Sequence, residues 1–159
     1  MTFWQTKSLD ELSPEEWEAL CDGCGRCCLH KLEDEDSGDI ALTRVACRLL
    51  DITNCRCGNY AQRFQHVPDC LDLRKQKVSD LAWLPKTCAY RLIDEGLTLP
   101  DWHPLISGNN HAIQSSGVSV TSFAVSETDV DDFEKLSCKM ISAKIKDFVE
   151  TEKWLTTVT

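Results

Sequence analysis

The residues of this sequence that could do chemistry are mainly its cysteines. The chain has 159 residues and 10 cysteines, and nine of these lie within residues 21–88. Cys21, Cys24 and Cys27 follow a C-x2-C-x2-C spacing, and Cys28 comes directly after them. A turn of this length lets several thiolates converge on one centre, and the two glycines of the run permit tight backbone geometry. Clustered thiols indicate metal binding more strongly than disulfides or redox pairs, because reduced cysteines in such clusters typically bind metal.

Nine cysteines are more than one site needs, since zinc and cubane iron–sulfur centres each take four ligands. Two four-ligand sites would use eight and leave one cysteine over. Side chains of adjacent residues diverge, so Cys27 and Cys28 could serve two different sites. The number of sites and the identity of the spare cysteine stay open. The predicted metal ligands are Cys21, Cys24, Cys27, Cys28, Cys47, Cys55, Cys57, Cys70 and Cys88.

The spacing bears on which metal is bound. Structural zinc sites usually have two separated C-x2-4-C segments. Here only the first segment has that form, because Cys55 and Cys57 are separated by one residue. Ferredoxin loops instead bring three cysteines together and add a distant fourth. The sequence therefore slightly favours an iron–sulfur cluster over zinc, and both stay open. The side chains that could offset thiolate charge are Arg26, Lys31, Arg48 and Arg56.

Other candidate residues have simpler explanations. His30 and His66 lie near the cysteines in sequence and could be ligands, but the thiols alone suffice. We interpret His103 as a residue that packs a loop. Cys138 lies far from the cluster, and we predict that it is an ordinary thiol. Cys88 is predicted in the first turn of a helix, where the helix dipole favours a thiolate.

Composition limits the function further. The net charge of −9 and a pI of about 4.8 argue against general nucleic-acid binding, because an acidic surface repels phosphates. No apolar run of about 18 residues predicts a membrane helix. The N-terminal residues do not resemble a secretory signal, so we expect the cytoplasm, where thiols stay reduced. No known catalytic motif is present, so the sequence decides neither for nor against an enzyme, and a protein partner stays unidentified.

The elements that must position these residues are short. We expect an α+β fold, mainly helical, with a minor β component and a loop-rich metal core. It would form a single domain over 1–159, with a cysteine-rich metal-binding part at 1–100 and a C-terminal helical part at 127–157. Ser13 caps a helix over 14–20, with Glu16 completing a capping box. The other predicted elements are helices over 71–83 and 88–95, strands over 40–42 and 118–125, and an ambiguous element over 45–50.

Cys21-Asp-Gly-Cys24-Gly-Arg-Cys27-Cys28-Leu-His-Lys31 resembles the start of the bacterial YcgN-like proteins. These belong to the CxxCxxCC group, to which a zinc- or iron-chelating role is attributed. The similarity continues through Cys55-Arg-Cys57-Gly-Asn-Tyr60 and Trp83-Leu-Pro85-Lys-Thr-Cys88, and it covers about four-fifths of the chain. What the resemblance implies is chelation without an assigned reaction. Related clusters accompany a flagellin lysine methylase, which implies an accessory role in protein modification as an alternative.

We therefore expect a metal-binding protein with an electron-transfer, structural or accessory role. The alternative is a metal-dependent enzyme in which one position on the metal stays open.

Overall fold

The computed structural model describes residues 1–34 and 36–130. Within it the chain forms two compact units. Unit 1 comprises Met1–Cys24 and Leu71–Ser119, and unit 2 comprises Gly25–Cys70 together with the described residues 120–130. Each unit is therefore built from two separate stretches of sequence. The prediction of a single domain stays a prediction.

Unit 1 is helical and is organised around α2 (Pro14–Leu20). Ser13 accepts a hydrogen bond from the Glu16 N–H, and the Glu16 carboxylate accepts one from the Ser13 N–H, as the capping box predicts. Trp17 stacks on Tyr90 of α4 (Ala89–Asp94) at a ring separation of 4.3 Å, and the Tyr90 hydroxyl donates to the Trp17 carbonyl. The buried side chains of this core are Leu12, Trp17, Leu20, Val78, Leu84, Ala89, Tyr90 and Leu99.

The remaining elements of unit 1 are single turns or little more. They are α1 (Phe3–Thr6), η1 (Leu9–Glu11), η4 (Leu73–Lys75), η5 (Val78–Asp80), α5 (Pro104–Ser107) and α6 (Ala112–Ser115).

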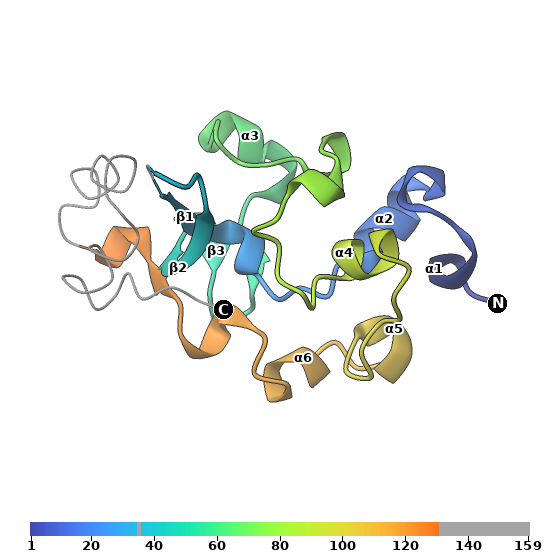
Figure 1. Ribbon diagram of the computed structural model, residues 1–159. Helices are drawn as coiled ribbons and strands as arrows, with labels where there is room; N and C mark the ends of the chain where they lie inside the picture. The colour runs from blue at the N-terminus through green and yellow to red at the C-terminus, as the bar shows by residue number, and fades with distance from the viewer. Residues whose placement is uncertain (35, 131–159) are drawn as a thin grey trace. The chain divides into compact units, whose positions relative to one another are not determined.

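Unit 2 contains a small sheet. β1 (Leu29–Glu33) pairs antiparallel with β2 (Ile40–Ala46), as Figure 1 shows. β5 (Val125–Ser126) adds to β2 in parallel. A second pair joins β3 (Leu50–Asp51) to β4 (Arg56–Cys57). The sheet positions the end of the cysteine run, because η2 (Arg26–Cys28) leads directly into β1. The short helical segments of this unit are η3 (Tyr60–Gln62), α3 (Arg63–His66), η6 (Val120–Ser122) and η7 (Glu127–Asp129).

The expectation of a mainly helical α+β fold is wrong. Among the described residues the longest helix is α2, with seven residues, and many helical segments are single 3-10 turns. Nearly half of the described chain lies in turns and loops. The reason is visible in the predicted helix over 71–83, which is replaced by η4 and η5. Residues 74–77 are all polar and exposed, so this stretch has no continuous apolar face to bury.

The predicted strands and the predicted helix over 88–95 agree with the structure to different degrees. The strand over 40–42 is confirmed and extends to Ala46, while the ambiguous stretch over 45–50 divides between β2 and β3. The strand over 118–125 is wrong apart from its last residue, because Ser119 and Val120 are both buried instead of alternating. The helix over 88–95 is confirmed as α4. Most of the predicted C-terminal helical part, 127–157, lies outside the described residues. No helix among the described residues is long and apolar enough to cross a membrane.

Candidate metal centre

The first turn of the cysteine run belongs to unit 1 and is shaped by Asp22. The Asp22 side chain is 6% exposed, and its Oδ1 accepts a hydrogen bond of 2.9 Å from the Cys24 N–H. Gly23 lies in the left-handed region with φ +74°, which permits the turn. Burial raises the pKa of the Asp22 carboxyl, although the Cys24 N–H acts in the opposite direction. Asp22 therefore organises the backbone between Cys21, which is exposed, and Cys24, which is buried.

The C-terminal end of α2, just before Cys21, is held in place by a hydrogen bond with His103. The fully buried His103 ring pairs its Nε2 with the Leu20 carbonyl at 2.9 Å, and its Nδ1 accepts from the Leu105 N–H at 3.0 Å. These partners assign the proton to Nε2. Burial lowers the pKa of His103, which keeps the ring neutral. The interpretation of His103 as a packing residue is confirmed.

In unit 2, the Cys55 sulfur packs against the backbone at Gly25. Gly25 has φ +77°, and a Cβ atom there would lie 2.6 Å from Cys55 Sγ and 2.7 Å from Val120 Cγ2. Only glycine fits this position. Cys55 is buried and itself adopts a positive φ of 54°. The backbone of the cysteine run is thus in close contact with a thiol that lies 30 residues further along the chain.

Five further cysteines of unit 2 share one electrostatic environment, and we name them the thiol group. The pKa of Cys28 is raised far above its ordinary value. The largest cause is a hydrogen bond with the Cys27 side chain, and burial and the charges of neighbouring thiols follow in size. Burial likewise raises the pKa of Cys47 and of Cys70, and nearby thiols add to both effects. The thiol group consists of Cys27, Cys28, Cys47, Cys57 and Cys70.

Cys27 and Cys28 both lie in the 3-10 turn η2. Interaction with the Cys27 side chain contributes to the raised pKa of Cys28. Whether these two cysteines serve one site or two stays a prediction.

Lys31 is the cation that lies among these thiols. Its Nζ donates to the Leu29 carbonyl at 3.0 Å and to the Cys27 carbonyl at 3.2 Å. Burial lowers the pKa of Lys31, while the charges of four members of the thiol group oppose that shift. Of the other cations that the sequence suggested, Arg48 and Arg56 are exposed. Arg26 is buried, and its Cζ lies 5.6 Å from the Phe123 ring centroid.

Glu127 is a residue that sequence reasoning did not select. One of its carboxylate oxygens lies 3.0 Å from His30 Nε2, and the other accepts from the Arg48 N–H at 2.7 Å. Its charge also raises the pKa of Cys47. Burial lowers the pKa of His30, and Glu127 opposes this effect. The pair joins residues 97 positions apart, so no local pattern could have indicated it.

The predicted ligands divide between the two units. Cys21, Cys24 and Cys88 belong to unit 1, and the other six belong to unit 2. All nine are thiols and none forms a disulfide. In the part of the chain that the structure describes, no three Cys, His, Asp or Glu side chains have converged to metal-binding spacing. The donor set nevertheless fits zinc or iron, because soft thiolates select these metals. The absence of a side chain at Gly25 also allows the Cys55 sulfur to lie against the backbone of the cysteine run. Which of the nine bind metal stays a prediction.

Comparison with known proteins agrees with this donor chemistry. Residues 20–89 match a family model described as "Putative zinc- or iron-chelating domain", CxxCxxCC. Similar relatives carry the name UPF0260 protein. The one from Proteus mirabilis is 54% identical over 132 residues, which cover 83% of this chain and 90% of the relative.

Two further relatives have comparable identity. The Cellvibrio japonicus protein is 57% identical over 134 residues, covering 83% of this chain and 91% of the relative. The YcgN protein of Escherichia coli K12 is 53% identical over 132 residues, covering 83% and 86%. No solved structure matches the chain significantly. The chain belongs to the UPF0260 family of proteins with a CxxCxxCC domain.

Proposed function

We propose that this protein binds a metal centre through its cysteines and that the thiol group of unit 2 supplies ligands to it. The observation that carries the proposal is the environment shared by the five thiols of the thiol group, four of which act on the charge of the Lys31 ammonium. Thiols beside one another are mutually unfavourable as thiolates, so they resist deprotonation without a compensating cation. A metal ion supplies that compensation and deprotonates its ligands outright. The family description as a zinc- or iron-chelating domain supports the same chemistry.

For the metal itself we propose an iron–sulfur cluster, with zinc as the second candidate. The cysteine spacing supports iron, because only residues 21–28 have the form of a zinc knuckle. Arg56 and Cys57 both lie in β4, where the extended backbone points successive side chains to opposite faces. An iron–sulfur cluster would supply one-electron chemistry, and zinc would supply structural stabilisation.

The role that we propose is electron transfer or structural support, in the cytoplasm. Nine reduced thiols support a reducing compartment. An enzyme with an open metal position is the second candidate, and the His30–Glu127 pair favours it, since a carboxylate that orients an imidazole is a common arrangement beside catalytic metals.

Purification of the full chain without oxygen tests the metal. Brown protein that contains iron and acid-labile sulfide would support the cluster. Colourless protein with stoichiometric zinc would exclude the redox role and support structural zinc. Carefully prepared protein without any bound metal would contradict both.

Matched substitutions test the ligands. Cys28→Ser, Cys47→Ser and Cys70→Ser should each lower the metal content of purified protein, because each removes one donor. Cys138→Ser is the control and should leave the metal content unchanged. Equal losses from Cys138→Ser and Cys47→Ser would contradict the assignment of ligands to the thiol group.

A further inference from the structure

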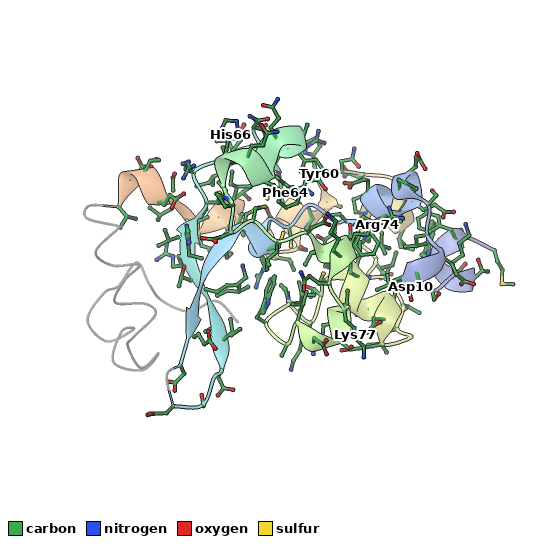
Figure 2. All side chains as sticks on the ribbon, turned by 90° about the horizontal axis from the view of Figure 1, so that it is seen from above. Asp10, Tyr60, Phe64, His66, Arg74 and Lys77 are labelled. Carbon is green, nitrogen blue, oxygen red and sulfur yellow. The ribbon has the colours of Figure 1, made fainter. Side chains whose placement is uncertain are left out.

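Unit 2 presents two exposed aromatic rings that the metal centre does not use. Tyr60 of η3 is 49% exposed and Phe64 of α3 is 39% exposed. Arg63 lies between them in sequence, and we name the three residues the aromatic–arginine cluster. Figure 2 shows Tyr60, Phe64 and His66 on this one segment. Large exposed rings in a segment of seven residues, 60–66, need an explanation other than the core.

The guanidinium of Arg63 is held against both rings. Its Cζ lies 3.8 Å from the Tyr60 ring centroid and 4.3 Å from the Phe64 ring centroid. Its Nη1 donates to the Tyr60 carbonyl at 2.7 Å. A planar guanidinium has five N–H donors, so the others stay available after this bond. A long side chain that is already ordered loses less conformational entropy when it binds a partner.

The local charge is opposite to that of the whole chain. Residues 40–68 contain four arginines and one acidic residue, Asp51, in a chain with a net charge of −9. Within the described residues none of these arginines forms an ion pair with a carboxylate. Those whose contacts are known donate to backbone carbonyls: Arg44 to Phe123, Arg48 to His66 and Arg63 to Tyr60. The positive charge of this stretch is therefore not neutralised by salt bridges within the described chain.

We propose that the aromatic–arginine cluster is a docking surface for an acidic segment of a partner protein. A carboxylate of that segment binds the Arg63 guanidinium through two parallel hydrogen bonds, and a neighbouring apolar side chain packs on Tyr60 and Phe64. Arginine and tyrosine dominate the binding energy of protein interfaces, and the planar fork of arginine matches a carboxylate. Charge complementarity selects the acidic partner.

The aromatic–arginine cluster lies near the thiol group, although the docking proposal does not require that a metal is bound there. The chain turns directly after α3, where the Cys70 N–H donates to the Val67 carbonyl at 3.0 Å. Burial raises the pKa of Cys70 and the charge of Arg63 opposes that shift, so the guanidinium lies within electrostatic reach of the thiol group. A docked segment would therefore lie close to the proposed metal ligands, as exchange of electrons or metal requires.

Selection from a random-peptide display library on the full-length protein tests the proposal. We expect enriched peptides in which Asp or Glu neighbours an aromatic or aliphatic residue. Synthetic copies should bind Arg63→Glu about tenfold or more weakly in fluorescence anisotropy. Arg63→Lys should restore only part of the affinity, because an ammonium lacks the planar fork. Lys77→Glu is the matched control: it makes the same charge change at an exposed residue of unit 1 (Figure 2) and should bind like the wild type.

Five outcomes would overturn the proposal. Four of them are the absence of enriched peptides, enrichment of peptides without acidic residues, equal affinity for Arg63→Glu, and Arg63-dependent binding of single-stranded DNA in place of peptide. Self-association that disappears in Arg63→Glu would assign the surface to a second copy and would also overturn it. Arg63→Lys keeps the charge near Cys70, so its metal content should equal that of the wild type while its peptide affinity falls; a failure of docking thus stays distinguishable from a failure of metal binding.

Discussion

At the level of single residues, Lys31 carries a charge into a partly buried position beside thiols. Its two hydrogen bonds to the Cys27 and Leu29 carbonyls hold the ammonium there. A site with several thiolates has net negative charge, which a neighbouring cation stabilises. We predict that Lys31→Met lowers metal affinity about tenfold and that Lys31→Arg lowers it less. Competition with a chelator measures this effect. Lys77→Met, which removes an exposed charge, is the control; the same affinity for Lys31→Met and the wild type would contradict the role.

His103 makes a second prediction at this scale. His103→Leu removes both ring nitrogens and leaves their partners, the Leu20 carbonyl and the Leu105 N–H, unsatisfied. We expect a loss of about 2 kcal/mol or more in the free energy of unfolding at neutral pH. Chemical denaturation measures it, with the exposed His111→Leu as control, expected within about 0.5 kcal/mol of the wild type.

The lowered pKa of His103 also fixes the direction of a pH effect. A group whose pKa is depressed in the folded state contributes stability above its unfolded pKa, about 6.5 for histidine, and this stability is lost as the pH falls. Stability of the wild type should therefore decrease from pH 7 to pH 5. The decrease should be smaller in His103→Leu, and an unchanged pH dependence would show that the ring is not the titrating group.

At the level of elements, two glycines of the cysteine run make different demands. Gly23 and Gly25 both have positive φ, but a Cβ at Gly23 would meet nothing within 4 Å. Gly23→Ala should cost only the left-handed conformation, about 1–2 kcal/mol. Gly25→Ala adds a clash with Cys55 and Val120, worth about 1–3 kcal/mol more. Thermal or chemical unfolding of the two variants measures the difference, and equal losses would mean that the Cys55 contact is dispensable.

Elements could be predicted where their signals are local. The cap of α2 depends on Ser13 and Glu16, which are three residues apart, and the sequence was sufficient. β5 is different, because Val125 pairs with Val45 of β2, and no short-range pattern encodes a parallel partner 80 residues away. The stretch over 118–125 has β-branched residues typical of a strand, yet Val120 is buried against Gly25. Tertiary packing therefore decided its structure over local propensity.

At the level of the whole molecule, the sequence identified the cysteines but not their distribution. The boundary between the two units falls between Cys24 and Gly25, inside the run that spacing alone presents as one loop. The contact of Gly25 with Cys55, and the environment that Cys28 shares with Cys47 and Cys57, arise only when distant segments fold together. Composition could not predict which thiols become neighbours.

The raised pKa values of Cys28, Cys47 and Cys70 lead to a prediction for the whole protein. Without metal, thiols whose pKa is raised in the folded state stabilise it below their unfolded pKa of about 8.5. That contribution is lost as the pH rises through the folded pKa, because the unfolded chain then binds fewer protons. With metal the direction reverses, since thiol ligands must release protons to bind and higher pH strengthens binding.

The difference in unfolding free energy between metal-loaded and chelator-treated protein should therefore grow from pH 7 to pH 9. Chemical denaturation of both forms measures it, and metal addition near neutral pH should release about one proton for each thiol ligand. Removal of Cys47, as in Cys47→Ser, should reduce the proton count, whereas Cys138→Ser should not. Parallel pH dependences of the two forms would mean that the thiols with raised pKa values are not the groups that bind the metal.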